Sequence, residues 1–357
     1  MKALQVFAGP RAREHLRRRG LQAADMRVIP AAAGGPKGLV LLPLDRYLFG
    51  MWLAASNHTV HLLGASIGAW RMAAACLPDA DAALAQLADD YITQTYPHLP
   101  GRMPAPHTVS ELFGHRLQQR LGDQAATILS HPRYRLHVFT SRGRRWLHNP
   151  GAVTLRLGWA AAFAANALSR RQLGRWMQRV VFSDPREALP FDLADYPTRQ
   201  VGLGSNNLAQ TVLASCSIPF ALDPVQDIPG APPGTYWDGG ITDHHLHLPF
   251  ANMEQGLVLY PHFGSQVVPG WLDKAWKGRH KATAALDNLV LLAPRPEWLK
   301  TLPNGKLPDR GDFQAYGEDI VRRQHDWRRA VAESQRLADE FAQLVGKGQP
   351  FDALPLV

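Results

Sequence analysis

The stretch that decides the fold covers residues 59–77 and reads Thr-Val-His-Leu-Leu-Gly-Ala-Ser-Ile-Gly-Ala-Trp-Arg-Met-Ala-Ala-Ala-Cys-Leu. Its first five residues are typical of a buried strand, and the Ala-rich part from Ala69 onward is typical of a helix. Only a Gly-x-Ser-x-Gly turn joins them, so Gly64 and Gly68 flank Ser66 where larger side chains would not fit. Such a turn holds the Ser66 hydroxyl clear of the backbone, over the positive end of the helix dipole, as in a nucleophile elbow.

Strands and helices alternate on both sides of this stretch. A helical pattern covers residues 39–49. Further short apolar runs, typical of strands, cover residues 26–30, 135–140, 256–260 and 289–292. Strands that alternate with helices predict an α/β fold, with a central, mostly parallel sheet flanked by helices on both faces.

The end of the chain has a different pattern. From about residue 318 to 344, apolar residues form one broad stripe at helical spacing and charged residues fill the other face. This predicts an amphipathic helix that packs back on the body of the protein. We therefore expect a main domain over residues 1–300 and a C-terminal helical extension over residues 301–357.

The composition is that of an ordinary globular protein, since 46% of the 357 residues are hydrophobic and 19% are charged. A fully disordered chain is thereby excluded. The 39 Lys and Arg residues outnumber the 30 Asp and Glu residues, which gives a net charge of +9. This balance favours an anionic partner, namely lipid headgroups, nucleic acid or an acidic metabolite.

Cysteine usage and apolar runs set the expected compartment. Cys76 and Cys216 are the only cysteines, and their apolar, small-residue surroundings indicate buried thiols. A disulfide scaffold and a Cys-rich zinc site are excluded. The sequence shows no long apolar leader and no run of about 18 apolar residues. We expect a cytoplasmic protein, either soluble or peripheral at a membrane.

A glycine-rich loop lies upstream of the elbow and also follows a predicted strand. Residues 33–38 read Ala-Gly-Gly-Pro-Lys-Gly. Glycines let backbone N–H groups converge on one point, as an oxyanion requires. A phosphate-binding loop would need Ser or Thr after Lys37, where Gly38 stands, and the Gly-x-Gly-x-x-Gly pattern of dinucleotide-binding proteins is absent.

A third motif lies far downstream, where residues 236–240 read Tyr-Trp-Asp-Gly-Gly. Two glycines after an apolar approach can present the carboxylate of Asp238 at a fixed point. Taken alone, the pattern is equally typical of a plain Asp-Gly turn.

Together the three motifs resemble the patatin-like phospholipases, which are acyl hydrolases with a Ser-Asp dyad. The family's oxyanion loop corresponds to Ala33–Gly38, its nucleophile elbow to Gly64–Gly68 and its Asp-Gly-Gly block to Asp238–Gly240. Residues 213–220, Leu-Ala-Ser-Cys-Ser-Ile-Pro-Phe, resemble the Ala-Ser-x-x-x-Pro segment that precedes this block in the family. The four blocks occur in the family's order and span roughly residues 27–250.

The resemblance implies a three-layer sandwich and serine acyl hydrolysis of a lipid or acyl ester, of phospholipase A type. Ser66 would be the nucleophile and Asp238 its base, without metal or cofactor. Oxyanion stabilisation would come from Gly34, Gly35 and Gly38, with Lys37 adding positive charge. A transacylase would use the same acyl-enzyme with a different acceptor.

The chain departs from the family pattern in two places. Ala32 and Ala33 replace the Asp and the first Gly of the usual Asp-Gly-Gly-Gly loop. Losing that Asp removes a group that braces the loop. The segment after Asp238 is also longer and richer in histidine than the usual Asn-x-Pro.

Histidines in this segment leave two other interpretations open. Asp243, His244, His245 and His247 lie within five residues, and the last two would share a face of a strand. They could ligate a divalent metal, although a solvated or loop-packing cluster is the simpler interpretation. Alternatively, one histidine could complete a Ser-His-Asp triad of an α/β-hydrolase.

A last alternative is a basic surface-binding protein without catalysis. Basic runs cover residues 11–19, 142–145 and 170–171, but no nucleic-acid fold motif accompanies them, so no nucleic-acid partner is expected. Residues 158–168 and 172–182 show helical spacing of apolar and aromatic residues beside arginines. This pattern suits an interfacial helix or lid on an anionic membrane surface, and it equally suits helices packed on the sheet.

Overall fold

A central sheet organises the computed structural model, which describes residues 1–98 and 104–357. The strand order is β11-β1-β10-β9-β2-β3-β4-β5-β6, with β8 paired to β4 and β7 paired to β8. The strands are β1 (Leu4–Ala8), β2 (Met26–Ala31), β3 (Val60–Ala65), β4 (Tyr134–Gly143), β5 (Met177–Ser183), β6 (Thr198–Gly202), β7 (Val225–Gln226), β8 (Thr235–Asp238), β9 (Leu257–Pro261), β10 (Leu289–Pro294) and β11 (Leu354–Pro355).

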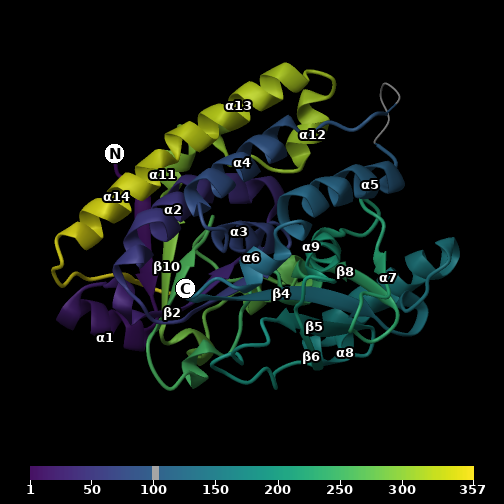
Figure 1. Cartoon of the computed structure of the whole chain (residues 1–357), viewed down its shortest axis with the longest axis horizontal. Coiled ribbons are helices and arrows are strands. Elements are labelled where there is room, and N and C mark those ends of the chain that lie inside the picture. Colours follow the sequence, from purple (N-terminus) through teal and green to yellow (C-terminus); the bar gives the residue numbers. More distant parts are fainter. Residues whose placement is uncertain (99–103) are drawn as a thin grey trace.

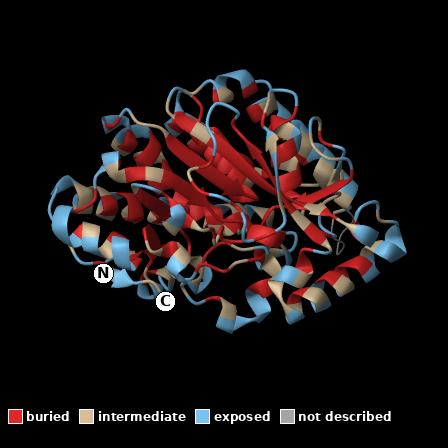
Figure 2. Cartoon of the chain, turned by 90° about the horizontal axis from the view of Figure 1, so that it is seen from below, coloured by how far each residue is buried: buried red, intermediate tan, exposed pale blue. Residues whose placement is uncertain are grey.

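The middle of the sheet is parallel. Strands β10, β9, β2, β3 and β4 all run the same way, whereas β1, β5 and β8 are antiparallel to a neighbour. Every residue of β3 and of β10 is buried, as expected for parallel strands covered on both faces. Figure 2 shows this buried sheet enclosed by helices with exposed outer faces. The predicted α/β class with a mostly parallel sheet is confirmed.

Helices cover both faces of the sheet. They are α1 (Pro10–Arg19), α2 (Leu42–Tyr47), α3 (Ile67–Ala75), α4 (Ala80–Thr93), α5 (Pro106–Leu117), α6 (Ala125–Leu129), α7 (Ala152–Leu168), α8 (Arg170–Leu173), α9 (Leu208–Cys216), α10 (Gly240–Asp243), α11 (Pro296–Leu299), α12 (Gly311–Tyr316), α13 (Ile320–Glu333) and α14 (Gln335–Gly346). Short 3-10 and π-helical segments include η2 (Gly35–Leu41), η3 (Leu48–Trp52), η4 (Leu53–Ala55) and η8 (Trp271–Ala275). In Figure 1, α13 and α14 form the outer layer over α4 and α2, which they contact.

Two expected helices are wrong. The single helix over residues 318–344 is two helices, α13 and α14, separated at Ser334, whose hydroxyl donates to the Val331 carbonyl (2.7 Å). A serine that binds a carbonyl of its own turn competes with the helix ladder, and an apolar stripe shared by both helices hides this break. The predicted boundary at residue 300, between a main domain and a C-terminal helical extension, stays a prediction.

The second wrong helix is the one over residues 172–182. Helix α8 ends at Leu173, and Met177–Ser183 form the buried strand β5, antiparallel to β4. Val180, Val181 and Phe182 favour a strand once a partner strand is present, so pairing with β4 overrides the helical spacing. The expected helix over 158–168 is confirmed as part of the longer α7.

One continuous helical run, Gly35–Ala55, is long and apolar enough to cross a membrane by length and composition. Of its most apolar window, 61% is buried within the protein. A core helix of a folded domain passes the same test, so the run is weak evidence for a membrane span. It combines η2, α2, η3 and η4 and begins in the glycine-rich loop.

Candidate active site

Ser66 sits in a strained turn between β3 and α3. Its backbone has φ 56° and ψ −130°, a region that costs a residue other than glycine about 1–3 kcal/mol. A Cβ on Gly68 would lie 2.0 Å from the Ala31 carbonyl oxygen, and a Cβ on Gly64 would lie 2.4 Å from Ala69 Cα. The turn therefore closes only with glycine at both positions, which explains the Gly-x-Ser-x-Gly pattern.

The Ser66 hydroxyl donates a hydrogen bond to the carboxylate of Asp238, with 2.7 Å between Oγ and Oδ2. Asp238 ends β8, which is antiparallel to β4, and β4 is the parallel neighbour of β3. Its second oxygen, Oδ1, accepts the Gly240 N–H at 2.7 Å. The topology thus brings together two residues separated by 172 positions.

Burial sets the basicity of this carboxylate. Both Ser66 and Asp238 are buried. Desolvation raises the pKa of Asp238 above its ordinary value, and the charge of Arg310 and the Ser66 hydrogen bond oppose this rise in part. A carboxylate with a raised pKa is a stronger proton acceptor than a solvated one.

The glycine-rich loop lies beside the elbow because β2 and β3 are parallel neighbours, with Ala31 opposite Gly64. Gly35, which starts η2, has φ 56°, and a Cβ on Gly38 would lie 3.1 Å from Ile67, the residue after the candidate nucleophile. First-turn N–H groups of a helix lack acceptors within it, so this loop can offer free donors.

A cavity of about 570 Å³ opens above Asp238. Gly34, Lys37 and Asp238 line it, whereas Ser66, Gly35 and Gly38 lie outside its lining. Much of the remaining wall is apolar and consists of Ile218, Pro219, Ile241, Phe263, Val268 and Trp271.

These features agree with the comparison of the whole sequence with known families. Residues 33–250 match the family described as patatin-like phospholipase. The chain belongs to this family. The match covers the loop, the elbow and the Asp-Gly-Gly block, and it supports lipid acyl hydrolysis as the general activity of this patatin-like chain.

Two solved structures are similar to this patatin-like chain in outline. VipD from Legionella pneumophila is 14% identical, with 92% of this chain and 68% of that chain covered and a TM-score of 0.40. Human GIVD cytosolic phospholipase A2 is 10% identical, with 94% and 65% covered and a TM-score of 0.38. The chain thus spans about two thirds of the length of each. A search of curated proteins gave no significant match.

Ser215 is a site residue that the sequence analysis did not single out. Its fully buried hydroxyl accepts the Ser66 N–H (2.8 Å) and donates to the Phe139 carbonyl on β4 (2.7 Å). The backbone carbonyls of Ser215 and Ser217 accept the N–H groups of Gly239 (3.1 Å) and Asp238 (2.9 Å). Ser215 therefore positions both the Ser66 turn and the Asp238–Gly240 segment. In the sequence it could have been found only as part of the Ala-Ser-x-x-x-Pro segment.

Two cations in the cavity were also missed. Lys274 and Arg310 line it together with Lys37, and in the described part of the chain none of the three forms an ion pair. Arg310 Nε would be 3.1 Å from a Cβ on Gly35. Lys274 is an exposed residue, but its ammonium group is partly desolvated by neighbouring atoms. This desolvation, followed by repulsion from Lys37 and Arg310, lowers the pKa of Lys274 to about 8. No local motif marks these residues.

The histidine segment does not form the expected strand. Asp243 ends α10 and pairs with Arg179. His245 Nδ1 accepts the Val268 N–H (3.0 Å), and His247 contacts Thr283 (3.3 Å). Residues 1–98 and 104–357 hold no group of three or more His, Cys, Asp or Glu side chains placed for a metal ion.

His244 lines the cavity, but the Ser66 hydroxyl bonds to Asp238 directly. Burial, followed by repulsion from Lys274, holds the pKa of His244 well below its ordinary value, which favours the neutral imidazole. Cys76 and Cys216 are buried and unpaired, as predicted.

Proposed function

We propose that this chain is a serine hydrolase of lipid carboxylic esters, with Ser66 as nucleophile and Asp238 as general base. The observation that carries the proposal is the 2.7 Å hydrogen bond from Ser66 Oγ to a buried carboxylate, made at a strained strand-to-helix turn. Nucleophile and base are within reach for proton transfer without a third residue.

In the first half-reaction, Ser66 Oγ attacks the ester carbonyl carbon while its proton passes to Asp238 Oδ2. Negative charge develops on the carbonyl oxygen, which the backbone N–H groups of Gly34 and Gly35 stabilise, assisted by the charge of Lys37. The tetrahedral intermediate collapses, and the leaving alkoxide takes the proton from Asp238. The product is an acyl-Ser66 ester and a free alcohol.

In the second half-reaction, Asp238 accepts a proton from a water molecule that attacks the acyl carbon. The proton returns to Ser66 Oγ as the acyl bond breaks, which releases the fatty acid and restores the starting state. With an alcohol in place of water, the same steps would make a transacylase. No cofactor or metal is part of this scheme.

The cavity supports a lipid with an anionic headgroup as substrate. Its apolar wall suits an acyl chain, and Lys37, Lys274 and Arg310 supply positive charge without an ion-pair partner among the described residues. We propose that these cations bind a phosphate-bearing headgroup. Peripheral contact with an anionic membrane belongs to this proposal, and the cytoplasmic location stays a prediction from the sequence.

Digestion of a mixed phospholipid extract, followed by lipid mass spectrometry, tests the proposal. We expect the wild-type protein to release fatty acid and lysophospholipid, and Ser66→Ala to release neither. Ser205→Ala, which changes an exposed serine, is the matched control and should behave as wild type. Hydrolysis by Ser66→Ala at the wild-type rate would refute the assignment.

The Ser-His-Asp alternative stays testable because His244 borders the cavity. A His244→Gln protein should keep most of its hydrolytic rate if Asp238 is the base. A loss as complete as that of Ser66→Ala would make His244 a member of a triad.

A further inference from the structure

The net positive charge of the protein comes from one segment. Residues 124–183 contain ten arginines and no acidic residue. The other 297 residues therefore carry 29 basic and 30 acidic side chains, so they are close to neutral. The net charge of +9 thus belongs to the part of the chain that includes α7, α8 and β5.

Within this segment, α7 exposes an apolar face. Val153 is 70% exposed, Leu157 52%, Phe163 46% and Leu168 81%. The other face of α7 packs through Trp159 and Ala162 into a small second core. Single exposed apolar residues are ordinary, but a row of them along a helix marks an interaction surface. Figure 1 shows α7 at the edge of the molecule, at the opposite end from α14.

Exposed arginines accompany this face. Arg145, Arg156, Arg171 and Arg175 are exposed, and across the described residues none of them forms an ion pair. Trp146, which is 53% exposed, packs edge-to-face on Trp176. Arginine beside exposed tryptophan and aliphatic side chains is a composition that the membrane–water interface favours.

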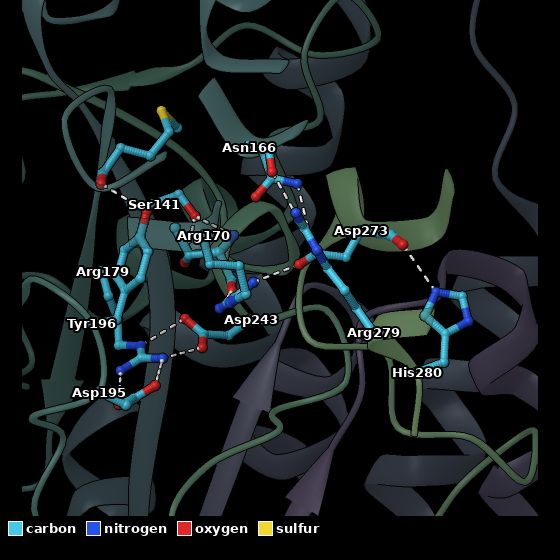
Figure 3. A network of polar contacts seen from close by, with 12 residues as sticks. Ser141, Asn166, Arg170, Arg179, Asp195, Tyr196, Asp243, Asp273, Arg279 and His280 are labelled. Carbon is cyan, nitrogen blue, oxygen red and sulfur yellow. Dashed lines mark hydrogen bonds and ion pairs between the residues drawn. The ribbon is translucent and has the colours of Figure 1, made fainter. Parts of the chain in front are cut away.

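The same helix is bonded to the cavity wall through Asp273, as Figure 3 shows. The buried Asp273 carboxylate accepts hydrogen bonds from Asn166 on α7 (2.9 Å), Arg170 on α8 (2.7 Å) and Arg279 (2.8 Å). Asp273 lies in η8, between the cavity-lining residues Trp271 and Lys274. Helix α7 and one wall of the cavity are therefore joined by hydrogen bonds through the buried side of the helix.

A second connection reaches the segment that follows the candidate base. Arg170 also donates to the Thr242 carbonyl (2.8 Å), and Arg179 on β5 is paired with Asp243 and Asp195. The segment 240–245 contributes Ile241, His244 and His245 to the cavity. Arginines of the acid-free segment thus hold two walls of the cavity.

We propose that the exposed face of α7, with Arg145, Arg156, Arg171 and Arg175, docks this protein onto an anionic lipid bilayer. This inference rests on the proposed function and names the surface that would hold the protein at the membrane that contains its substrate. Charge complementarity selects the bilayer, because a second copy would bring like charges together. Phosphate contacts dominate nucleic-acid affinity and do not need an apolar row, whereas such a row gains free energy by entering the interface of a bilayer.

Vesicle sedimentation with the Ser66→Ala protein tests docking independently of catalysis. We expect binding to phosphatidylcholine vesicles that contain phosphatidylglycerol, weaker binding to pure phosphatidylcholine, and loss of the difference at high salt. The double variant Leu157→Gln/Phe163→Gln should lower the partition coefficient at least about tenfold. Arg156→Gln should lower it about fivefold, which corresponds to ~1 kcal/mol per arginine near an anionic surface.

Val321→Gln is the control, since Val321 is an exposed apolar residue on α13, away from this surface, and it should bind as the parent does. Circular dichroism establishes that each variant is folded. Equal binding by the parent and the double variant would overturn the proposal, as would dimerisation through this face without lipid or tighter binding to RNA. Hydrolysis by Ser66→Ala would refute the proposed function and leave the docking result standing.

Discussion

Two groups of charged residues flank the segment 238–245, and they differ in how their charges are balanced. In the network of Figure 3, the fully buried Arg179 has carboxylates on both sides, and Asp273 has two arginines. In the cavity, Lys37, Lys274 and Arg310 repel one another, and within the described residues they have no ion-pair partner. Paired charges hold elements together, whereas unpaired cations around a cavity are free to bind a ligand.

The largest effect should come from the buried carboxylate that is hydrogen-bonded to Ser66. Asp238→Asn removes the proton acceptor of Ser66, so we expect kcat/KM for a short-chain nitrophenyl ester to fall about a hundred- to ten-thousandfold. Because burial of this charge is unfavourable, the melting temperature should hold or rise. Asp192→Asn, at an exposed aspartate, is the control. Retained activity in Asp238→Asn would remove the proposed base.

Substitutions in the paired group, the network of Arg179 and Asp273, should lower the stability of the fold. Arg179→Met leaves the buried carboxylate of Asp243 without its partner, so we expect the free energy of unfolding to fall by about 3–5 kcal/mol. Arg175→Met, at an exposed arginine of the same segment, should change it by less than about 0.5 kcal/mol. Urea denaturation measures both. Similar losses in the two variants would show that pairing of Arg179 contributes little.

Substitutions of the unpaired cations in the cavity should instead weaken substrate binding. Lys274→Gln and Arg310→Gln should each raise KM for an anionic phospholipid about fivefold, as expected for an exposed charge pair, with little change in stability. KM for a neutral diacylglycerol should stay near the wild-type value. Lys277→Gln changes a nearby exposed lysine outside the cavity and serves as control. Equal effects on both substrates would contradict headgroup binding.

The smallest effect concerns pH. Lys274 has a pKa near 8, so its ammonium is charged below that pH and loses its charge as the pH rises through it. Preference for an anionic over a neutral lipid should therefore decline by a few-fold between about pH 7 and pH 9. Lys274→Arg keeps its charge over this range and should abolish the decline. The ratio of kcat/KM for the two lipids, measured across this range, checks the prediction.

Much of the candidate site could be predicted because its motifs are local. The elbow needs glycine on both sides of Ser66 since the Ala31 carbonyl and Ala69 would otherwise overlap a side chain. Steric requirements of this kind act over a few residues and are legible in the sequence. Ser215 was named only as part of a motif, because its role depends on contacts with β3 and β4 that no short pattern specifies.

By itself, the sequence determined the α/β class, the elbow, the glycine-rich loop and the Asp-Gly-Gly block. Tertiary structure decided that residues 177–183 form a strand, that Lys274 and Arg310 join Lys37 in one cavity, and that the histidine segment is divided among separate partners. Local sterics and hydrophobic periodicity are encoded in neighbouring residues, so they can be predicted from a single chain. Strand pairing and the convergence of distant charges depend on which elements the topology brings together, and only the folded chain fixes that.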